Sequence, residues 1–176
     1  MLAAPTGRAA KRMFESSGKE AKTIHRMLEA SISDNGHHHF SRDEENPITQ
    51  KVIIIDEMSM VDTNLMCALL KAVKTGSYLI LIGDPDQLPP VGPGNCLNDI
   101  ISSDRFNVVR LNKIFRQAEQ SLIVMNAHAI NNGEMPKLNS RDNDFFFVEK
   151  GNADEVKTLL LSFVAERLPK RYDADP

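Results

Sequence analysis

The sequence is poor in several features that would each define a class of protein. It has no tryptophan and only two cysteines among 176 residues, Cys67 and Cys96. Two cysteines are too few for a disulfide scaffold or a four-ligand zinc site, so a reducing cytoplasm is the expected location. No apolar run approaches the ~18 residues of a membrane-spanning helix, and the N-terminus lacks a secretory pattern, so no membrane contact is expected. The net charge of −3 gives no overall basic character, so any nucleic-acid contact must rest on a local patch.

What remains is a globular composition, 41% hydrophobic and 26% charged, in which strand and helix patterns alternate. The apolar runs 52–55 and 78–82 are typical of strands buried on both faces of a parallel sheet. Such alternation predicts an α/β fold, a doubly wound and mainly parallel sheet between helices. The other elements expected are helices at 7–17, 23–30, 63–74, 96–102, 118–131 and 153–168, strands at 1–4, 107–111 and 144–149, and an exposed polar excursion at 31–50.

Polar side chains follow two successive strands of this sheet. Asp56 and Glu57 come directly after 52–55, and Gln87 lies in the loop after 78–82. An aspartate at a strand end can hold a magnesium-bound water, and the next carboxylate can polarise an attacking water toward a phosphate. The carboxylate pair taken alone is equally well explained as the start of a loop. Two neighbouring strands that deliver polar groups to one edge are harder to explain by packing.

Two further segments carry phosphate-binding chemistry. Arg116 follows an apolar pair, and its planar guanidinium suits the charge on a departing phosphoryl group, although an exposed arginine usually has no such role. Thr6 and the backbone amides at the expected helix start suit a phosphate, with Arg8, Lys11 and Arg12 nearby. A solvated basic helix face is the stronger explanation of this second segment taken alone.

In this order, the segments resemble the motifs of superfamily 1 DNA helicases, and their sequences are similar to those of the RecD/TraA branch. The match covers roughly the whole chain and is dense up to Gln117. Its motifs are A-P-T-G-R-A-A at 4–10, T-I-H-R at 23–26, D-E-M-S-M-V-D at 56–62, G-D at 83–84 with the segment that runs to Pro90, and F-R-Q at 115–117.

The resemblance implies a RecA-like P-loop NTPase fold and a motor that uses ATP and magnesium to move 5′ to 3′ along single-stranded DNA. Asp56 would be the magnesium ligand and Glu57 the catalytic base. Gln87 would sense the terminal phosphate, and Arg116 would be an arginine finger. The residues implied on the DNA path are Pro5, Thr6, Arg8, Thr23 and His25. DNA repair and recombination would be the setting, with recombination or exonuclease subunits as partners.

One motif of that family is absent from the sequence. The phosphate-cradling loop has the form G-x-x-x-x-G-K-[ST], whereas the Gly18-Lys19 pair is followed by Glu20. The expectation is therefore an internal fragment of a motor, inactive as an ATPase by itself. Residues 1–110 would belong to a first RecA-like domain without its N-terminal strand and phosphate loop, and residues 111–176 would begin the second.

Two other functions stay open at this point. The first is a DNA-dependent ATPase motor that does not separate strands. The second is a docking module of a recombination or exonuclease complex whose motor has decayed, although the retained Asp56 and Glu57 count against it. The run of histidines at 37–39 is expected to lie in a solvated loop, because adjacent side chains cannot all reach one ion.

Overall fold

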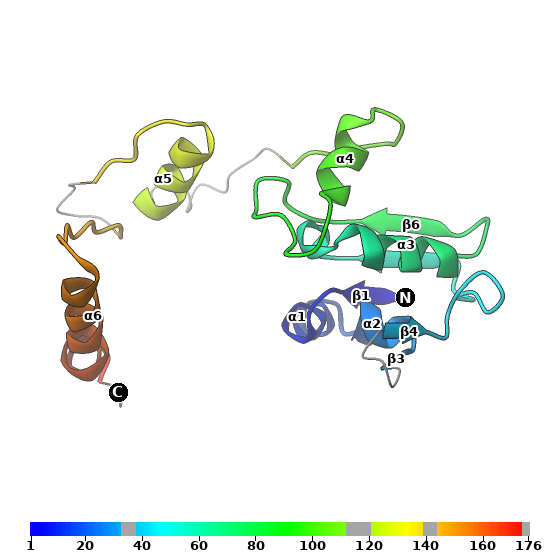
Figure 1. The fold of residues 1–176 in the computed structure, drawn as a ribbon, viewed down its shortest axis with the longest axis horizontal. Coiled ribbons are helices and arrows are strands. Elements are labelled where there is room, and N and C mark those ends of the chain that lie inside the picture. Colours follow the sequence, from blue (N-terminus) through cyan, green and yellow to red (C-terminus); the bar gives the residue numbers. More distant parts are fainter. Residues whose placement is uncertain (33–37, 112–120, 139–143, 174–176) are drawn as a thin grey trace. The chain divides into compact units, whose positions relative to one another are not determined.

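The computed structural model describes residues 1–32, 38–111, 121–138 and 144–173 (Figure 1). The chain divides into two compact units. Unit 1 is Met1–Arg110 and unit 2 is Leu111–Pro176.

Unit 1 is built on a four-stranded sheet in which every pairing is parallel. The strand order is β2 (Ala21–Thr23), β1 (Leu2–Ala4), β5 (Val52–Ile55) and β6 (Tyr78–Leu81). Ile53 and Ile55 of the inner strand β5 are fully buried, as the β-branched run predicts. The α/β fold with a mainly parallel sheet is confirmed.

Helices cover both faces of this sheet. Successive strand residues point to opposite faces. Ala3 belongs to a core cluster with Met66 and Leu69 of α3 (Thr63–Ala72), whereas Ala4 packs with Ala9 and Ala10 of α1 (Gly7–Ser17). α1 and α3 therefore lie on opposite sides, which makes the sheet doubly wound.

The connections explain why the two helices lie on opposite faces. α1 joins β1 to β2, and the chain there moves away from β5. α3 joins β5 to β6, and the chain there moves away from β1. Crossovers between parallel strands are right-handed, so opposite directions of travel place the helices on opposite faces. The winding direction reverses between β1 and β5.

Several helix ends lie where the sequence places them. Thr6 caps α1, and Gly18 ends it with a φ of 67°, a left-handed conformation that suits glycine. Asp62 caps α3 through its side chain, and α4 (Cys96–Ser102) has the expected bounds. The helix expected over 23–30 is shorter, α2 (Ile24–Met27), because Glu29 adopts the left-handed conformation (φ 53°) and β3 begins at position 30.

Three expectations about strands were wrong. The polar excursion 31–50 contains an antiparallel pair, β3 (Ala30–Ile32) and β4 (His38–Phe40), so two of the three histidines are in a strand, while position 37 lies outside the described residues. No strand forms over 107–111 or over the segment 144–149. Their apolar side chains, such as Val109 and Phe146, are exposed and find no neighbouring strand among the described residues.

Unit 2 consists of helices and loops in its described part. It contains α5 (Leu122–Asn131), α6 (Ala153–Ser162), the π-helical turn η2 (Phe163–Arg167) and α7 (Leu168–Tyr172). The helix expected over 153–168 therefore exists but includes η2. Pro169, in the first turn of α7, lacks the backbone N–H that would continue regular α-helical bonding. The start of the helix expected over 118–131 lies outside the described residues.

Candidate functional site

The candidate residues of unit 1 lie along one edge of its sheet. Parallel strands end at the same edge, and ligands of such sheets bind there. Arg116 lies outside the described residues. The others follow the carboxyl ends of the four strands: Pro5, Thr6 and Arg8 after β1, Thr23 and His25 at the end of β2 and the start of α2, Asp56 and Glu57 after β5, and Gln87 after β6.

A cavity of about 340 Å³ lies beside β1 and β5, the two strands between which the winding of the sheet reverses. Its lining extends from Asp56 and Glu57, at the carboxyl end of β5, along α1 to Leu2, the first residue of β1. Arg12, Ser16 and Ser17 of α1 also line it. Ligand sites of doubly wound sheets form where the winding reverses, outside the carboxyl ends of the strands, and the carboxylate pair is the part of this cavity that lies there. The sequence placed Arg12 on a basic helix face, and it did not show that this side chain shares a cavity with the carboxylate pair.

The carboxylate pair lies in a tightly held turn. The Asp56 amide donates to the Ala3 carbonyl (3.0 Å), and Asp56 Oδ1 accepts a hydrogen bond from the Glu57 amide (2.9 Å). Glu57 adopts the left-handed conformation, with φ 55° and ψ 42°, which costs a residue other than glycine about 1–3 kcal/mol. The Met58 amide bonds to the Ile82 carbonyl (2.9 Å) and fixes this turn against the end of β6. Strain of this kind clusters at functional sites.

The donor atoms in this turn fit magnesium. Asp56 and Glu57 are half-buried, and Oδ2 of Asp56 has no hydrogen bond from the described residues. Magnesium is commonly bound through one or two carboxylates together with substrate phosphates. The described residues contain no group of three or more histidine, cysteine or carboxylate side chains that could hold a metal ion without such a substrate.

The loop after β6 is fixed against the turn after β5. A Cβ on Gly83 would lie 3.0 Å from the Met58 amide nitrogen, so glycine allows the close approach. The Thr63 amide donates to the Pro93 carbonyl (2.9 Å). Between these points, the Ser59 hydroxyl donates to Gln87 Oε1 (3.3 Å). The structure therefore brings Gln87 into contact with the segment that carries the carboxylate pair.

The two candidate threonines both cap helices. Thr6 Oγ1 accepts the Ala9 amide (3.2 Å) at the start of α1, and Thr23 Oγ1 accepts the Arg26 amide (3.2 Å) at the start of α2. Capping explains both residues structurally. It uses acceptor capacity only, so each hydroxyl can still donate a hydrogen bond outward.

The other candidates on this side of the sheet differ in exposure. Pro5 is half-buried and Arg8 is exposed. His25 is half-buried, and its ring lies 5.9 Å, centroid to centroid, from the ring of Phe40 in β4. The sequence missed this aromatic neighbour, because Phe40 lies within the polar segment 31–50, for which no strand was predicted.

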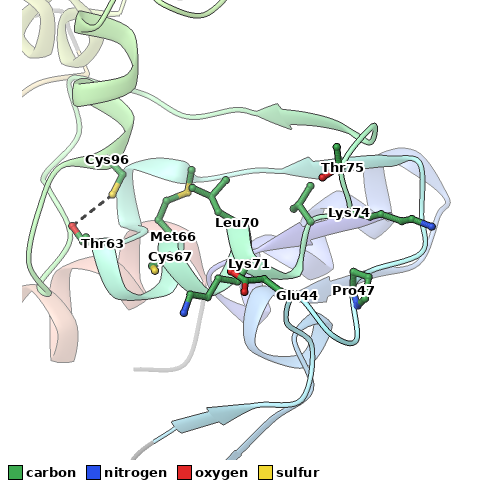
Figure 2. A pocket seen from close by; sticks show the side chains of 11 residues that line it. Glu44, Pro47, Thr63, Met66, Cys67, Leu70, Lys71, Lys74, Thr75 and Cys96 are labelled. Carbon is green, nitrogen blue, oxygen red and sulfur yellow. Dashed lines mark hydrogen bonds between the residues drawn. The ribbon is translucent and has the colours of Figure 1, made fainter.

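A larger cavity, of about 770 Å³, lies along α3 and contains none of the predicted site residues (Figure 2). The thiol of Cys96 lies 3.8 Å from the Thr63 hydroxyl at one end of it. Cys67, Leu70 and Lys74 are also among its lining residues. Neither of the two cysteines forms a disulfide.

In the described part of the chain, no helix is both long enough and apolar enough to span a bilayer. A family model described as an AAA domain matches residues 1–93. The ATP-dependent RecD2 DNA helicase of Deinococcus radiodurans is 38% identical over 135 residues, which is 77% of this chain and 18% of the relative. The RecD subunit of the RecBCD enzyme of Mycobacterium tuberculosis is 39% identical over 123 residues, 61% of this chain and 20% of the relative.

The chain thus spans about a fifth of the length of these curated relatives. A Bacteroides Pif1 helicase, solved with ADP-AlF3 and single-stranded DNA, matches 95% of this chain and 47% of its own, with 21% identity and a TM-score of 0.48. The AAA domain match extends over more than half of the 176 residues, and the helicase motifs lie in order within the chain. The chain therefore belongs to the AAA domain family, and its sequence is similar to a segment of superfamily 1 helicases of the RecD/TraA type.

Proposed function

We propose that this chain supplies the water-activating and DNA-contacting part of an ATP-dependent DNA helicase motor. One observation carries the proposal. Strands β5 and β1 are hydrogen-bonded neighbours, and the carboxylate turn follows β5 while the Thr6 loop follows β1. Nucleotide chemistry and DNA contact would then share one sheet edge. The similarity to the ATP-dependent RecD2 DNA helicase of Deinococcus radiodurans supports this proposal.

The nucleotide half of the proposed site is the β5–β6 side. Asp56 would hold magnesium, which when bound neutralises charge on the ATP phosphates. Glu57 accepts a proton from the attacking water as general base. Gln87 directs its amide at the terminal phosphate. Arg116 would contribute a guanidinium to the charge that develops there. Residues 1–110 would belong to a first RecA-like domain, and residues 111–176, which include Arg116, would begin a second.

The DNA half is the β1–β2 side. The exposed guanidinium of Arg8 and the outward-facing donor capacity of the Thr6 and Thr23 hydroxyls suit phosphate oxygens. Pro5 and His25 complete the proposed path of single-stranded DNA. Because the Asp56 amide bonds to β1, a movement of the carboxylate turn reaches the Thr6 loop across one strand pair. We also propose that the motor moves 5′ to 3′, that it is cytoplasmic, and that its partners are subunits of a recombination or exonuclease complex.

A chimera tests the nucleotide half. This chain replaces the matching segment of the Deinococcus radiodurans RecD2 helicase, and ATP turnover is measured with and without single-stranded DNA. Glu57→Gln should lower kcat by about 10²–10⁴-fold with nucleotide binding retained, the usual size of general-base assistance. The matched control is Glu149→Gln, which removes an exposed carboxylate of unit 2 and should leave kcat unchanged. Normal ATP turnover in the Glu57→Gln variant would show that Glu57 is not the general base.

The DNA half can be tested on the chain itself by fluorescence anisotropy with single-stranded DNA over a salt series. Replacement of Arg8, Lys11 and Arg12 by alanine should weaken binding and reduce the log–log salt slope by about 2, because each neutralised phosphate contributes roughly −0.7. A control with the same change in net charge replaces three exposed lysines of unit 2, Lys150, Lys157 and Lys170, and should keep the slope. Equal losses in both variants would mean that the DNA path is not on α1.

Tailed duplexes separate the proposal from a motor that moves without unwinding. In the chimera, ATP-dependent strand separation on a 5′-tailed duplex, and not on a 3′-tailed one, is the expected result. ATP turnover that DNA stimulates without any strand separation would favour the DNA-dependent ATPase instead.

A further inference from the structure

Ser59 is a buried hydroxyl in a place where packing would favour an apolar residue. It is the middle residue of η1 (Met58–Met60), directly after the carboxylate pair, and is 5% exposed. Its neighbour Met58 is fully buried in the core. Among the described residues of unit 1, Ser59 is the single buried polar side chain. A buried hydroxyl costs free energy unless it forms a hydrogen bond, so its partner shows what it does.

That partner is the side chain of Gln87, 28 positions further along the chain. The Ser59 hydroxyl donates to Oε1 of Gln87 at 3.3 Å. A glutamine amide has one oxygen that accepts and one nitrogen that donates twice. Since Oε1 accepts the hydrogen bond from Ser59, the two N–H groups of Nε2 remain available as donors. A phosphate oxygen or a water molecule can accept hydrogen bonds from them.

The backbone around Gln87 is already fixed by other contacts. The Gln87 amide bonds to the Asp84 carbonyl (3.3 Å), and Asn98 Nδ2 donates to the Pro85 carbonyl (3.2 Å). What these contacts leave undetermined is the rotation of a long and flexible side chain, which loses conformational entropy when it is ordered. The hydrogen bond from Ser59 to Oε1 of Gln87 restricts this rotation.

We infer that Ser59 is a positioning residue that orients the amide of Gln87 and so links the turn after β5 to the loop after β6. One hydrogen bond would then couple ATP hydrolysis at the carboxylate turn to phosphate recognition by Gln87. The orientation follows from geometry, while its use in phosphate recognition rests on the proposed function.

Side-chain NMR of the ¹⁵N-labelled 176-residue chain tests the orientation without any nucleotide. The Nε2 signal of Gln87 is assigned by its loss in Gln87→Ala. Its order parameter should be close to the rigid value of about 0.85, and in Ser59→Ala it should fall below about 0.6. Ser59→Thr keeps the hydroxyl and should restore the order. The control is Ser103→Ala, which removes a hydroxyl bonded to the Ile100 carbonyl (2.7 Å) in the same unit and should leave Gln87 unchanged.

Two results would overturn the inference. One is a mobile Gln87 amide in the unaltered chain, which needs no variant and therefore stands even where Ser59→Ala fails to fold. The other is an amide as ordered in Ser59→Ala as in the unaltered chain.

Failure of the proposed function has a different signature. If Gln87→Ala in the chimera leaves ATP turnover normal, Gln87 does not sense the phosphate. The positioning role of Ser59 would still be supported if the Gln87 amide is ordered in the unaltered chain and becomes mobile in Ser59→Ala. If both stand, Ser59→Ala should lower kcat more than it changes KM, and it should add no further loss to Gln87→Ala. An added loss in the double variant would mean that Ser59 acts on the site by another route.

Discussion

Units 1 and 2 are stabilised in different ways. Among the described residues, every fully buried or nearly buried apolar side chain belongs to unit 1, with the exception of Leu122. Large apolar side chains of unit 2, such as Phe146, Leu160 and Leu168, are exposed. Unit 1 has a sheet with helices on both faces, whereas the described part of unit 2 has helices without a sheet to pack on. The first unit is therefore stabilised mainly by the hydrophobic effect.

In the described part of unit 2, side chains form hydrogen bonds with the backbone at helix ends. Ser121 and Asp144 both accept backbone amides at the start of α5, and Asn152 does the same for α6. Asn126, 2% exposed, exchanges two hydrogen bonds with the backbone of Lys137. Such contacts contribute locally and modestly. The comparison indicates that the candidate site lies in the unit able to hold it rigidly.

The largest effect on stability should come from a cavity in the core of unit 1. Leu69→Ala removes a fully buried side chain of α3 and should lower the free energy of unfolding by about 2–5 kcal/mol. The matched change in unit 2 is Leu160→Ala on α6, where the side chain is 56% exposed and the loss should stay within about 0.5 kcal/mol. Urea unfolding followed by circular dichroism measures both. Equal losses would show that unit 2 has a core of its own.

A methyl group at Gly83 tests how tightly the loop after β6 and the turn after β5 of unit 1 are packed together. Its Cβ would lie 2.9 Å from Leu97 Cδ2 and 3.0 Å from the Met58 amide nitrogen, so either the loop after β6 or the turn after β5 must move. Gly83→Ala should cost about 1–3 kcal/mol, as overpacking does. The control is Gly7→Ala, where nothing lies within 4 Å and no loss is expected. A Gly83→Ala variant as stable as the control would mean that these two loops are loosely joined.

Local signals in the sequence predicted much of unit 1 and less of unit 2. The β-branched run 52–55 and the helix start at position 63 each depend on residues within one strand or turn, and both were predicted correctly. The segments 107–111 and 144–149 have the same apolar content as strands, but a strand also needs a neighbour to pair with, and local composition carries no information about neighbours. The β3–β4 pair was missed for the opposite reason, since pairing stabilises a segment whose composition is polar.

The candidate site shows the same limit. The carboxylate pair could be found because it follows a recognisable strand. The cavity beside β1 and β5 depends on strand order, which the local patterns do not specify. The contact between Ser59 and Gln87 spans 28 positions. One signal for this contact was present in the sequence. Ser59 lies between Met58 and Met60, in the segment that follows the carboxylates, and a polar residue between apolar ones indicates a buried hydrogen bond.

The smallest effect concerns the acidic cap of unit 2. The hydrogen bond from the Ser121 hydroxyl, and then the amides of Ile123 and Leu122, hold the pKa of Asp144 below its ordinary value of 3.8. A carboxylate with a lowered pKa stabilises the folded state above its ordinary pKa, and this contribution is lost as the pH falls through the lowered value. The side chain is exposed, so solvent keeps the effect small.

Asp144→Asn should therefore speed amide hydrogen exchange in α5 near neutral pH and make no difference below the lowered pKa, where the aspartic acid is itself neutral. Exchange measured by NMR across pH 2–7 resolves this, with rates corrected for the intrinsic effect of pH. The control is Glu149→Gln, which removes a carboxylate that caps no helix among the described residues and should leave α5 unchanged at every pH. A difference for Asp144→Asn that persists undiminished in acid would show that α5 depends on the geometry of the cap and not on its charge.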